Sequence, residues 1–194
     1  MAFSVSNSVA LVSGANRGIG RSVVEALLER GAKKVYAGVR KLESLGDLGD
    51  RVVGVEFDIT NSDQLKAAAE TASDTNLLIN NAGIVAGRIG LSITDPDSLS
   101  AARNEMDVNF HGTLSASQAF APILAANGGG TLVNLVSVAG IVNFPLLVTY
   151  SASKAALHSL TQAAASRPGR ARHLCGRGLP RTGRHRARRW GRDG

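Results

Sequence analysis

A glycine-rich loop, Ser13-Gly14-Ala15-Asn16-Arg17-Gly18-Ile19-Gly20, links a short apolar run at 9–12 to a helical pattern. A continuous apolar run that ends at glycine is typical of a strand buried on both faces. Gly14 permits a tight turn, Gly18 lets the backbone approach a phosphate, and Gly20 lets the helix pack closely on the strand. The spacing is G-x-x-x-G-x-G and not the commoner G-x-G-x-x-G, so an ordinary glycine-rich turn stays open as the alternative.

Strands and helices alternate along the following part of the chain. Apolar runs predict further strands at 34–39, 52–57, 77–79 and 131–138, and helical patterns cover about 62–72, 97–126 and 150–165. This alternation indicates an α/β fold, with a parallel sheet between two helical layers. The inner face of the 97–126 helix is expected at Leu99, Ala102, Met106, Phe110, Thr113 and Ser117.

The net charge of +7 is unevenly distributed along the 194 residues. Residues 167–194 carry ten Arg and one acid, whereas residues 1–166 carry 12 basic and 14 acidic side chains. The first part therefore gives no indication of a polyanionic ligand. We expect one domain over 1–166, followed by an Arg/Gly-rich tail over 167–194 without a strand or helix period.

Two explanations fit the tail. A shifted reading frame turns GC-rich Ala and Gly codons into Arg, Pro and Gly codons, and the absence of Lys from the tail agrees with this. A basic arm that binds nucleic acid is the alternative. Such arms usually mix Lys with Arg, so we favour the frame shift and do not expect a nucleic-acid partner.

Cysteine content and hydropathy exclude several classes of protein. Cys175 is the only cysteine, which excludes a disulfide framework and a cysteine-rich zinc site. No metal-ligand spacing occurs elsewhere, so no metal is expected. No charged leader precedes an apolar stretch, and no apolar run approaches the roughly 20 residues of a membrane span. The sequence predicts a soluble, cytoplasmic protein.

Ser137, Tyr150 and Lys154 form a second candidate group. Tyr150 and Lys154 are four residues apart on a predicted helix and so share a face. A nearby lysine cation favours the ionised form of a tyrosine, which suits acid–base chemistry, and a serine hydroxyl at a strand end can bind a substrate oxygen. Taken alone, a Tyr-x-x-x-Lys pair is more often part of an ordinary surface helix.

Together these motifs resemble the short-chain dehydrogenase/reductase family over about residues 8–165. They occur in the family's order, each on the expected element: the glycine loop, Asn80-Asn81-Ala82-Gly83, Asn109, Ser137, Tyr150 and Lys154. The resemblance implies a Rossmann-type, doubly wound three-layer αβα fold, with the family's C-terminal strands missing here. It also implies hydride transfer between a nicotinamide cofactor and a carbonyl or alcohol substrate.

The resemblance further implies a role for each matching residue. Tyr150 would be the general acid or base, Lys154 would assist it and bind the nicotinamide ribose, and Ser137 would position the substrate oxygen. Asn109 would hold a water that links Lys154 to solvent. The implied cofactor-binding residues are Gly14, Asn16, Arg17, Gly18, Ile19, Gly20, Arg40, Asp58, Ile59, Asn81, Ala82, Gly83, Tyr150 and Lys154. Without the family, Asp58 is better explained as a turn or capping residue.

Charge indicates which nicotinamide cofactor is preferred. NAD sites of this kind place an acid after the second strand, where it binds the ribose 2′-hydroxyl. Here residues 36–41 contain no acid and end in Arg40-Lys41. Arg40 can pair with a 2′-phosphate and Arg17 can add a second contact, so we expect NADP(H) to be preferred over NAD(H). The alternative is that Arg40 is a solvated surface charge.

Three functions stay open at this point. The leading one is an NADP(H)-dependent oxidoreductase acting on a carbonyl/alcohol pair, and the alternatives are an inert nucleotide-binding remnant and nucleic-acid binding through the tail. The apolar segment 142–147 indicates either a hydrophobic substrate or a loop packed on the core. The resemblance also implies a homo-oligomer formed through the helices 97–126 and 150–165.

Overall fold

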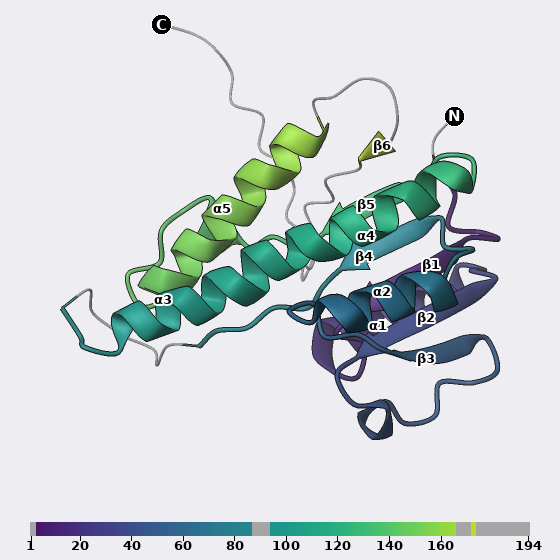
Figure 1. The fold of residues 1–194 in the computed structure, drawn as a ribbon, viewed down its shortest axis with the longest axis horizontal. Coiled ribbons are helices and arrows are strands. Elements are labelled where there is room, and N and C mark those ends of the chain that lie inside the picture. Colours follow the sequence, from purple (N-terminus) through teal and green to yellow (C-terminus); the bar gives the residue numbers. More distant parts are fainter. Residues whose placement is uncertain (1–2, 87–93, 166–171, 174–194) are drawn as a thin grey trace, which may run out of the picture.

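The computed structural model describes residues 3–86, 94–165 and 172–173. Its centre is a parallel sheet with the strand order β3-β2-β1-β4-β5-β6 (Figure 1). The strands are β1 Val9–Ser13, β2 Lys34–Val39, β3 Val52–Glu56, β4 Leu77–Asn80, β5 Thr131–Asn134 and β6 Arg172–His173. The helices are α1 Gly18–Glu29, α2 Ser62–Thr71, α3 Ser98–Met106, α4 Thr113–Ala126 and α5 Val148–Ala165, with a π-helical segment η2 Asp107–Gly112 and 3-10 turns η1 Leu42–Ser44 and η3 Val138–Gly140. The predicted α/β fold is confirmed.

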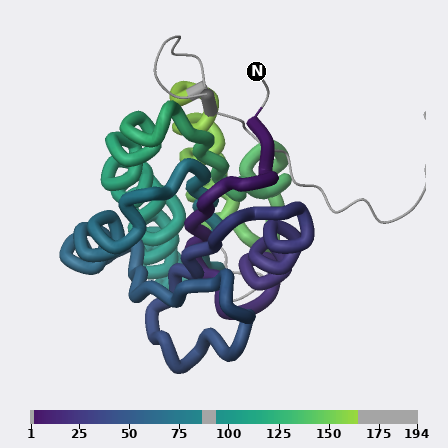
Figure 2. The backbone as a smooth tube through the Cα atoms, turned by 90° about the vertical axis from the view of Figure 1, so that its right-hand side faces the viewer, coloured from purple at the N-terminus to yellow at the C-terminus, as the bar shows by residue number. Residues whose placement is uncertain are grey.

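Each face of the sheet packs against its own helices (Figures 1 and 2). On one face Leu11 and Leu78 contact Phe120 of α4 and the buried side chains of α2. On the other face Val12 contacts Val24 of α1. Since successive residues of a strand point to opposite faces, all five residues of β1 are buried, which explains its uninterrupted apolar sequence.

The strand order reverses between β1 and β4. The chain runs outward from β1 to β3 and then returns, through α2, to place β4 on the other side of β1. In doubly wound sheets, ligands bind outside the carboxyl ends of the strands at this switch point. The glycine loop follows β1 and the segment 81–83 follows β4, so both lie there.

The last two strands differ from the prediction. β5 ends at Asn134 and not at 138, because its partner β4 ends at Asn80. The last contact between the two strands is the hydrogen bond from the N–H of Leu135 to the Asn80 carbonyl, at 2.9 Å. The sequence predicts no strand in the tail, yet β6 pairs with Thr131 and Leu132 of β5. The family's further C-terminal strands are absent from the part of the chain that the structure describes. Cys175 and most of the predicted tail lie outside the described residues.

The predicted 97–126 helix consists of three consecutive segments, α3, η2 and α4. It begins at Ser98, because the Asp95 carboxylate accepts the N–H of Asp97 at 3.1 Å in a turn before the helix. The predicted inner face is wrong, since Leu99 is 59% exposed and Thr113 alone of the predicted set is buried. The buried positions are Ala101, Glu105, Asn109, Gly112, Thr113, Ala116, Phe120 and Leu124. Polar side chains that bind backbone groups occupy two of them, so apolar periodicity misplaced the face.

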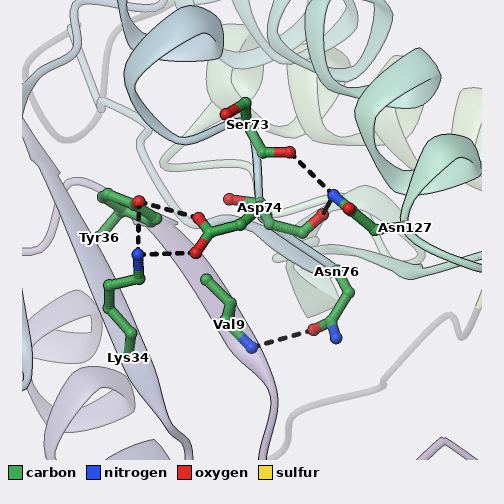
Figure 3. A network of polar contacts seen from close by, with 8 residues as sticks. Val9, Lys34, Tyr36, Ser73, Asp74, Asn76 and Asn127 are labelled. Carbon is green, nitrogen blue, oxygen red and sulfur yellow. Dashed lines mark hydrogen bonds and ion pairs between the residues drawn. The ribbon is translucent and has the colours of Figure 1, made fainter.

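A polar network holds the amino end of the sheet (Figure 3). The Lys34 ammonium lies 2.7 Å from the Asp74 carboxylate, and the Tyr36 hydroxyl donates to that carboxylate at 2.8 Å. Asn76 accepts the N–H of Val9 at 3.0 Å. The hydrogen bond to Asp74 raises the pKa of Lys34. The network joins β1 and β2 to the loop before β4, at the edge opposite the switch point.

Candidate active site

The glycine loop leads from β1 into the N-terminus of α1. Gly14 and Gly18 have φ angles of +67° and +53°, in the left-handed region that glycine adopts without strain. Arg17 is the N-cap of α1, no side chain of the described residues caps this helix, and its first turn contains no acid. The N–H groups of the first turn are therefore available to an anion. A Cβ added to Gly18 would meet nothing within 4 Å, so the space before the loop is open.

Asn81 attaches the glycine loop to the end of β4. Its amide nitrogen donates to the carbonyls of Ser13 at 2.9 Å and Gly14 at 3.1 Å. The Ser13 hydroxyl in turn accepts the N–H groups of Asn81 and Ala82, both at 3.0 Å. A Cβ on Gly20 would collide with the Gly14 carbonyl, so α1 packs directly on the loop. The structure thus brings together two of the predicted cofactor-binding segments.

Asn109 is fully buried in η2 and binds the segment after β4. Its Oδ1 accepts the N–H of Ile84 at 2.8 Å, and its Nδ2 donates to the Ile84 carbonyl and to the Ser153 hydroxyl, both at 2.9 Å. Both amide hydrogens of Asn109 are therefore used within the protein. Gly83 packs against both Asn109 and Lys154, since a Cβ on Gly83 would be 3.0 Å from Asn109 Oδ1 and 3.3 Å from Lys154 Nζ.

Lys154 is buried on α5, with 5% of its surface exposed. Its Nζ donates to the carbonyl of Leu135 at 3.0 Å and lies 5.9 Å from the centre of the Tyr150 ring. Burial lowers the pKa of the Lys154 ammonium to about 8. A lysine with this pKa still carries its charge at pH 7. The four-residue spacing places Tyr150 and Lys154 together, as the sequence predicts.

Ser137 follows β5 and caps the 3-10 turn η3. Its Oγ accepts the N–H of Ala139 at 3.2 Å, which leaves the hydroxyl hydrogen available to a ligand. The turn packs directly on α5, because a Cβ on Gly140 would collide with the Lys154 carbonyl. Among the described residues, Ser137 makes no hydrogen bond with Tyr150 or Lys154. The structure brings η3 against the face of α5 that carries Lys154, without joining these three side chains to one another by hydrogen bonds.

Two exposed arginines follow the carboxyl ends of β1 and β2. Neither Arg17 nor Arg40 forms a side-chain hydrogen bond or ion pair with another described residue. The Asn16 amide donates to the Ser44 hydroxyl at 3.3 Å and so links the glycine loop to η1, which follows Arg40. Both guanidinium groups are therefore free for an anion near the adenosine end of the predicted cofactor site.

Asp58 and Ile59 follow the end of β3. One oxygen of Asp58 accepts the N–H of Thr60 at 2.9 Å and its hydroxyl at 2.7 Å. This is the turn geometry that the sequence left open as the alternative for Asp58. Ile59 is 4% exposed and belongs to the apolar core. Neither residue contacts the glycine loop through a hydrogen bond within the described residues.

Sequence reasoning missed a set of buried polar side chains behind the site. The Asn80 amide donates to Asn134 at 2.9 Å, and the Asn134 amide donates to the Thr161 hydroxyl at 3.0 Å, which joins β4, β5 and α5. Glu105, also buried, accepts the N–H of Ala86 at 2.8 Å. No signal of spacing or composition distinguishes Asn134, Thr161 or Glu105 from exposed polar residues, whereas Asn80 belongs to the motif at 80–83. Within the described residues no three His, Cys, Asp or Glu side chains are grouped to hold a metal, and no helix is long and apolar enough to cross a membrane.

Comparisons with known proteins agree with this arrangement. Residues 8–171 match the sequence profile of the short chain dehydrogenase family. An uncharacterized oxidoreductase of Staphylococcus aureus (strain USA300) is 34% identical over 169 residues, which cover 81% of this chain and 70% of the relative.

Two solved structures are similar over most of the described fold. A short chain dehydrogenase from Burkholderia cenocepacia J2315 in complex with NADP has a TM-score of 0.80 and 48% identity, covering 89% of this chain and 72% of that one. A short chain dehydrogenase/reductase from Burkholderia phymatum in complex with NAD has a TM-score of 0.71 and 30% identity, covering 84% and 60%. With the match over residues 8–171 and the fold in agreement, the chain belongs to the short-chain dehydrogenase family of oxidoreductases.

Proposed function

We propose that this chain transfers a hydride between NADP(H) and a carbonyl/alcohol substrate. The observation that carries the proposal is the buried Lys154, placed between the Tyr150 ring and Gly83 at the switch point of the sheet. A buried lysine that forms no ion pair with another described residue costs stability, and its place beside a tyrosine supports a catalytic role.

The residues at the switch point fit a dinucleotide. Gly18 leaves open space before α1, where the pyrophosphate would lie against the N–H groups of the first turn, while Gly14 packs closely on Asn81 and Ala82. The binding residues proposed in the loop and beside it are Gly14, Asn16, Arg17, Gly18, Ile19, Gly20, Asn81, Ala82 and Gly83. Ile19 is 67% exposed at this position, which agrees with a contact outside the core. Asp58 would bind the adenine through the oxygen that is not used in its turn, with Ile59 beside it.

The chemistry divides between the cofactor and three side chains. A bound NADPH would supply the hydride. Tyr150 would donate its hydroxyl proton to the carbonyl oxygen, and Ser137 would donate a hydrogen bond to the same oxygen and orient it. Lys154, charged below about pH 8, would stabilise the resulting phenolate and bind the nicotinamide ribose.

A proton relay from Lys154 would pass Asn109. Both hydrogens of the Asn109 amide are bound to Ile84 and Ser153, so a water would bind at the remaining lone pair of Oδ1. That oxygen lies next to Gly83, and Lys154 Nζ lies against the same residue. The position supports a water between Asn109 and Lys154 that passes protons to solvent.

Arg40 and Arg17 support a preference for NADP(H). Both are exposed beside the glycine loop, and no acid of the described residues follows β2 before Glu43. A 2′-phosphate would accept charge-assisted hydrogen bonds from guanidinium groups, whereas a 2′-hydroxyl gains little from them. The similar structure from Burkholderia cenocepacia holds NADP and that from Burkholderia phymatum holds NAD, so the comparisons are compatible with either cofactor.

The substrate proposed is apolar beside its carbonyl group. Between Ser137 and Tyr150, the side chains of Val138, Ile141, Val142, Phe144 and Leu146 are 41–59% exposed, so this segment is not packed on the core. Residues 138–149 contain no charged side chain that would bind a phosphate or carboxylate. This observation favours the hydrophobic-substrate alternative over the packed loop.

We further propose a cytoplasmic homo-oligomer, with one domain over 1–166. α5 packs beside α3 and η2, so the two predicted interface helices lie side by side (Figure 1). An inert nucleotide-binding protein is the second candidate, because among the described residues Ser137 makes no hydrogen bond with Tyr150 or Lys154.

The Tyr150→Phe variant tests the proposed function. NADPH oxidation is measured with a panel of alkyl aryl ketones, and NADPH affinity is measured by fluorescence titration. We expect turnover by the native chain and its loss in Tyr150→Phe, while the Kd for NADPH changes less than about twofold, because the hydroxyl acts on the carbonyl oxygen. NADPH binding without turnover of any ketone by the native chain would identify the inert nucleotide-binding protein.

A further inference from the structure

Glu105 is a fully buried acid that the proposed chemistry does not use. It lies on α3 with 0% of its surface exposed, and its Oε1 accepts the N–H of Ala86 at 2.8 Å. Burying a carboxyl group is unfavourable unless its oxygens accept hydrogen bonds. Glu105 lies one helical turn before Asn109, so the backbone groups that these two side chains bind are considered together.

Glu105 and Asn109 together hold one short extended segment. They are four residues apart on consecutive helical turns and so share a face. The backbone groups of Ile84 and Ala86 face this helix, because side chains of the helix bind both of them. Asn109 binds the N–H and the carbonyl of Ile84, and Glu105 binds the N–H of Ala86. The intervening Val85 is 50% exposed and faces away.

These bonds replace those of a neighbouring strand. Beyond Asn80, the described residues that follow β4 pair with no strand. The side chains of Glu105 and Asn109 bind their backbone groups instead. Gly83 immediately precedes the held segment and lies against both Asn109 Oδ1 and Lys154 Nζ. Movement of residues 84–86 would therefore displace the backbone against which Lys154 is placed.

We propose that Glu105 is a positioning residue for hydride transfer, because it fixes residues 84–86 and through them Gly83 and Lys154. This inference rests on the proposed function. The glycine loop is held separately, by Asn81 and Ser13, at the other side of the switch point. Loss of the Glu105 contact is therefore expected to affect the reacting end of the site and to leave dinucleotide affinity nearly unchanged.

Three variants of the full chain separate the contact from general stability. Glu105→Gln keeps an oxygen that accepts the Ala86 N–H, and Glu105→Ala removes it. Leu124→Ala is the matched control, because Leu124 is a buried residue of similar size on α4 and its core cluster contains none of residues 84–86. For each variant we would measure kcat, the Kd for NADPH, and amide hydrogen exchange at Ala86 in the absence of nucleotide.

We expect Glu105→Ala to lower kcat by about ten- to a hundredfold and to speed Ala86 exchange, with Kd within about twofold of the native value. Glu105→Gln should stay within about threefold of the native kcat, and Leu124→Ala should keep both kcat and the Ala86 exchange rate. Native kcat together with slow Ala86 exchange in Glu105→Ala would overturn the proposal, as would equal losses of kcat in Glu105→Ala and Leu124→Ala.

The exchange measurement also separates this proposal from the proposed function. If the native chain turns over no ketone, the proposed function fails, while protection of Ala86 that is lost in Glu105→Ala still supports the positioning contact. Unchanged exchange would refute the contact in either case. If Glu105→Ala does not fold, Glu105→Asp shortens the side chain by one methylene, and the same expectations apply to it.

Discussion

Replacement of Lys154 by methionine removes a buried cation and keeps a side chain of similar length. Lys154 has 5% of its surface exposed, and burial lowers the pKa of its ammonium from 10.5 to about 8. Because the unfolded chain binds this proton more tightly than the folded one, the lysine destabilises the fold at pH 7. A difference of that size in pKa corresponds to about 3 kcal/mol.

Part of the stability that Lys154→Met gains by removing the buried charge is lost again. Lys154 Nζ donates to the Leu135 carbonyl, and the loss of this hydrogen bond costs about 1 kcal/mol. We therefore expect Lys154→Met to be about 2 kcal/mol more stable than the native chain at pH 7. The native chain recovers stability as pH rises through 8 towards 10.5, so the difference should shrink by about 2 kcal/mol between pH 7 and 9.5. Turnover should be lost in the variant at every pH.

Urea unfolding at pH 7 and 9.5 measures this difference. Lys66→Met is the matched control, because Lys66 is exposed on α2 and its replacement should change stability little at either pH. A stability difference between Lys154→Met and the native chain that is the same at both pH values would refute the reasoning. It would show that the folded chain does not disfavour the charged form of Lys154.

Other predictions concern the cofactor, the pH profile and the amino end of the sheet. Arg40→Asp should raise the Kd for NADPH by about ten- to a hundredfold and change the Kd for NADH little, as measured by fluorescence titration; equal changes for both would contradict the 2′-phosphate contact. The kcat/KM for ketone reduction should fall as pH rises through about 8, because free Lys154 loses its charge there. Asp74→Asn should lower stability by less than about 1 kcal/mol at pH 7, since the pair with Lys34 is half-exposed. Burial raises the pKa of Asp74, but the hydrogen bonds from Lys34 and Tyr36 together with the Lys34 charge outweigh burial and lower it. The difference should therefore vanish as pH falls below 3.8, with NADPH affinity unchanged throughout.

The strands and the glycine loop could be predicted because their signals are local. The β1 run is apolar throughout because both faces of the strand are covered. Tyr150 and Lys154 are four residues apart, and this spacing alone predicts that they lie on one face of a helix. The end of β5 could not be predicted in this way, because it is set by where β4 stops and not by its own apolar residues.

The inner face of the long helix was misplaced for a similar reason. Glu105 and Asn109 are polar, yet both are buried because they bind the backbone of residues 84–86, which is distant in sequence. Asp58 shows the opposite case, since its local turn with Thr60 is the explanation that residue type alone supports. Residues that are buried through contacts with distant parts of the chain produce no regular spacing of apolar residues in the sequence.

Deuterium transfer from NADPH labelled at the nicotinamide C4 position reports hydride transfer without relying on loss of absorbance. The full native chain would be incubated with labelled NADPH and an alkyl aryl ketone, and the alcohol would be analysed by mass spectrometry, with Tyr150→Phe as the control. We expect deuterium on the carbinol carbon with the native chain and none with Tyr150→Phe. Saturable NADPH binding with no labelled alcohol from the native chain would contradict the proposed oxidoreductase activity.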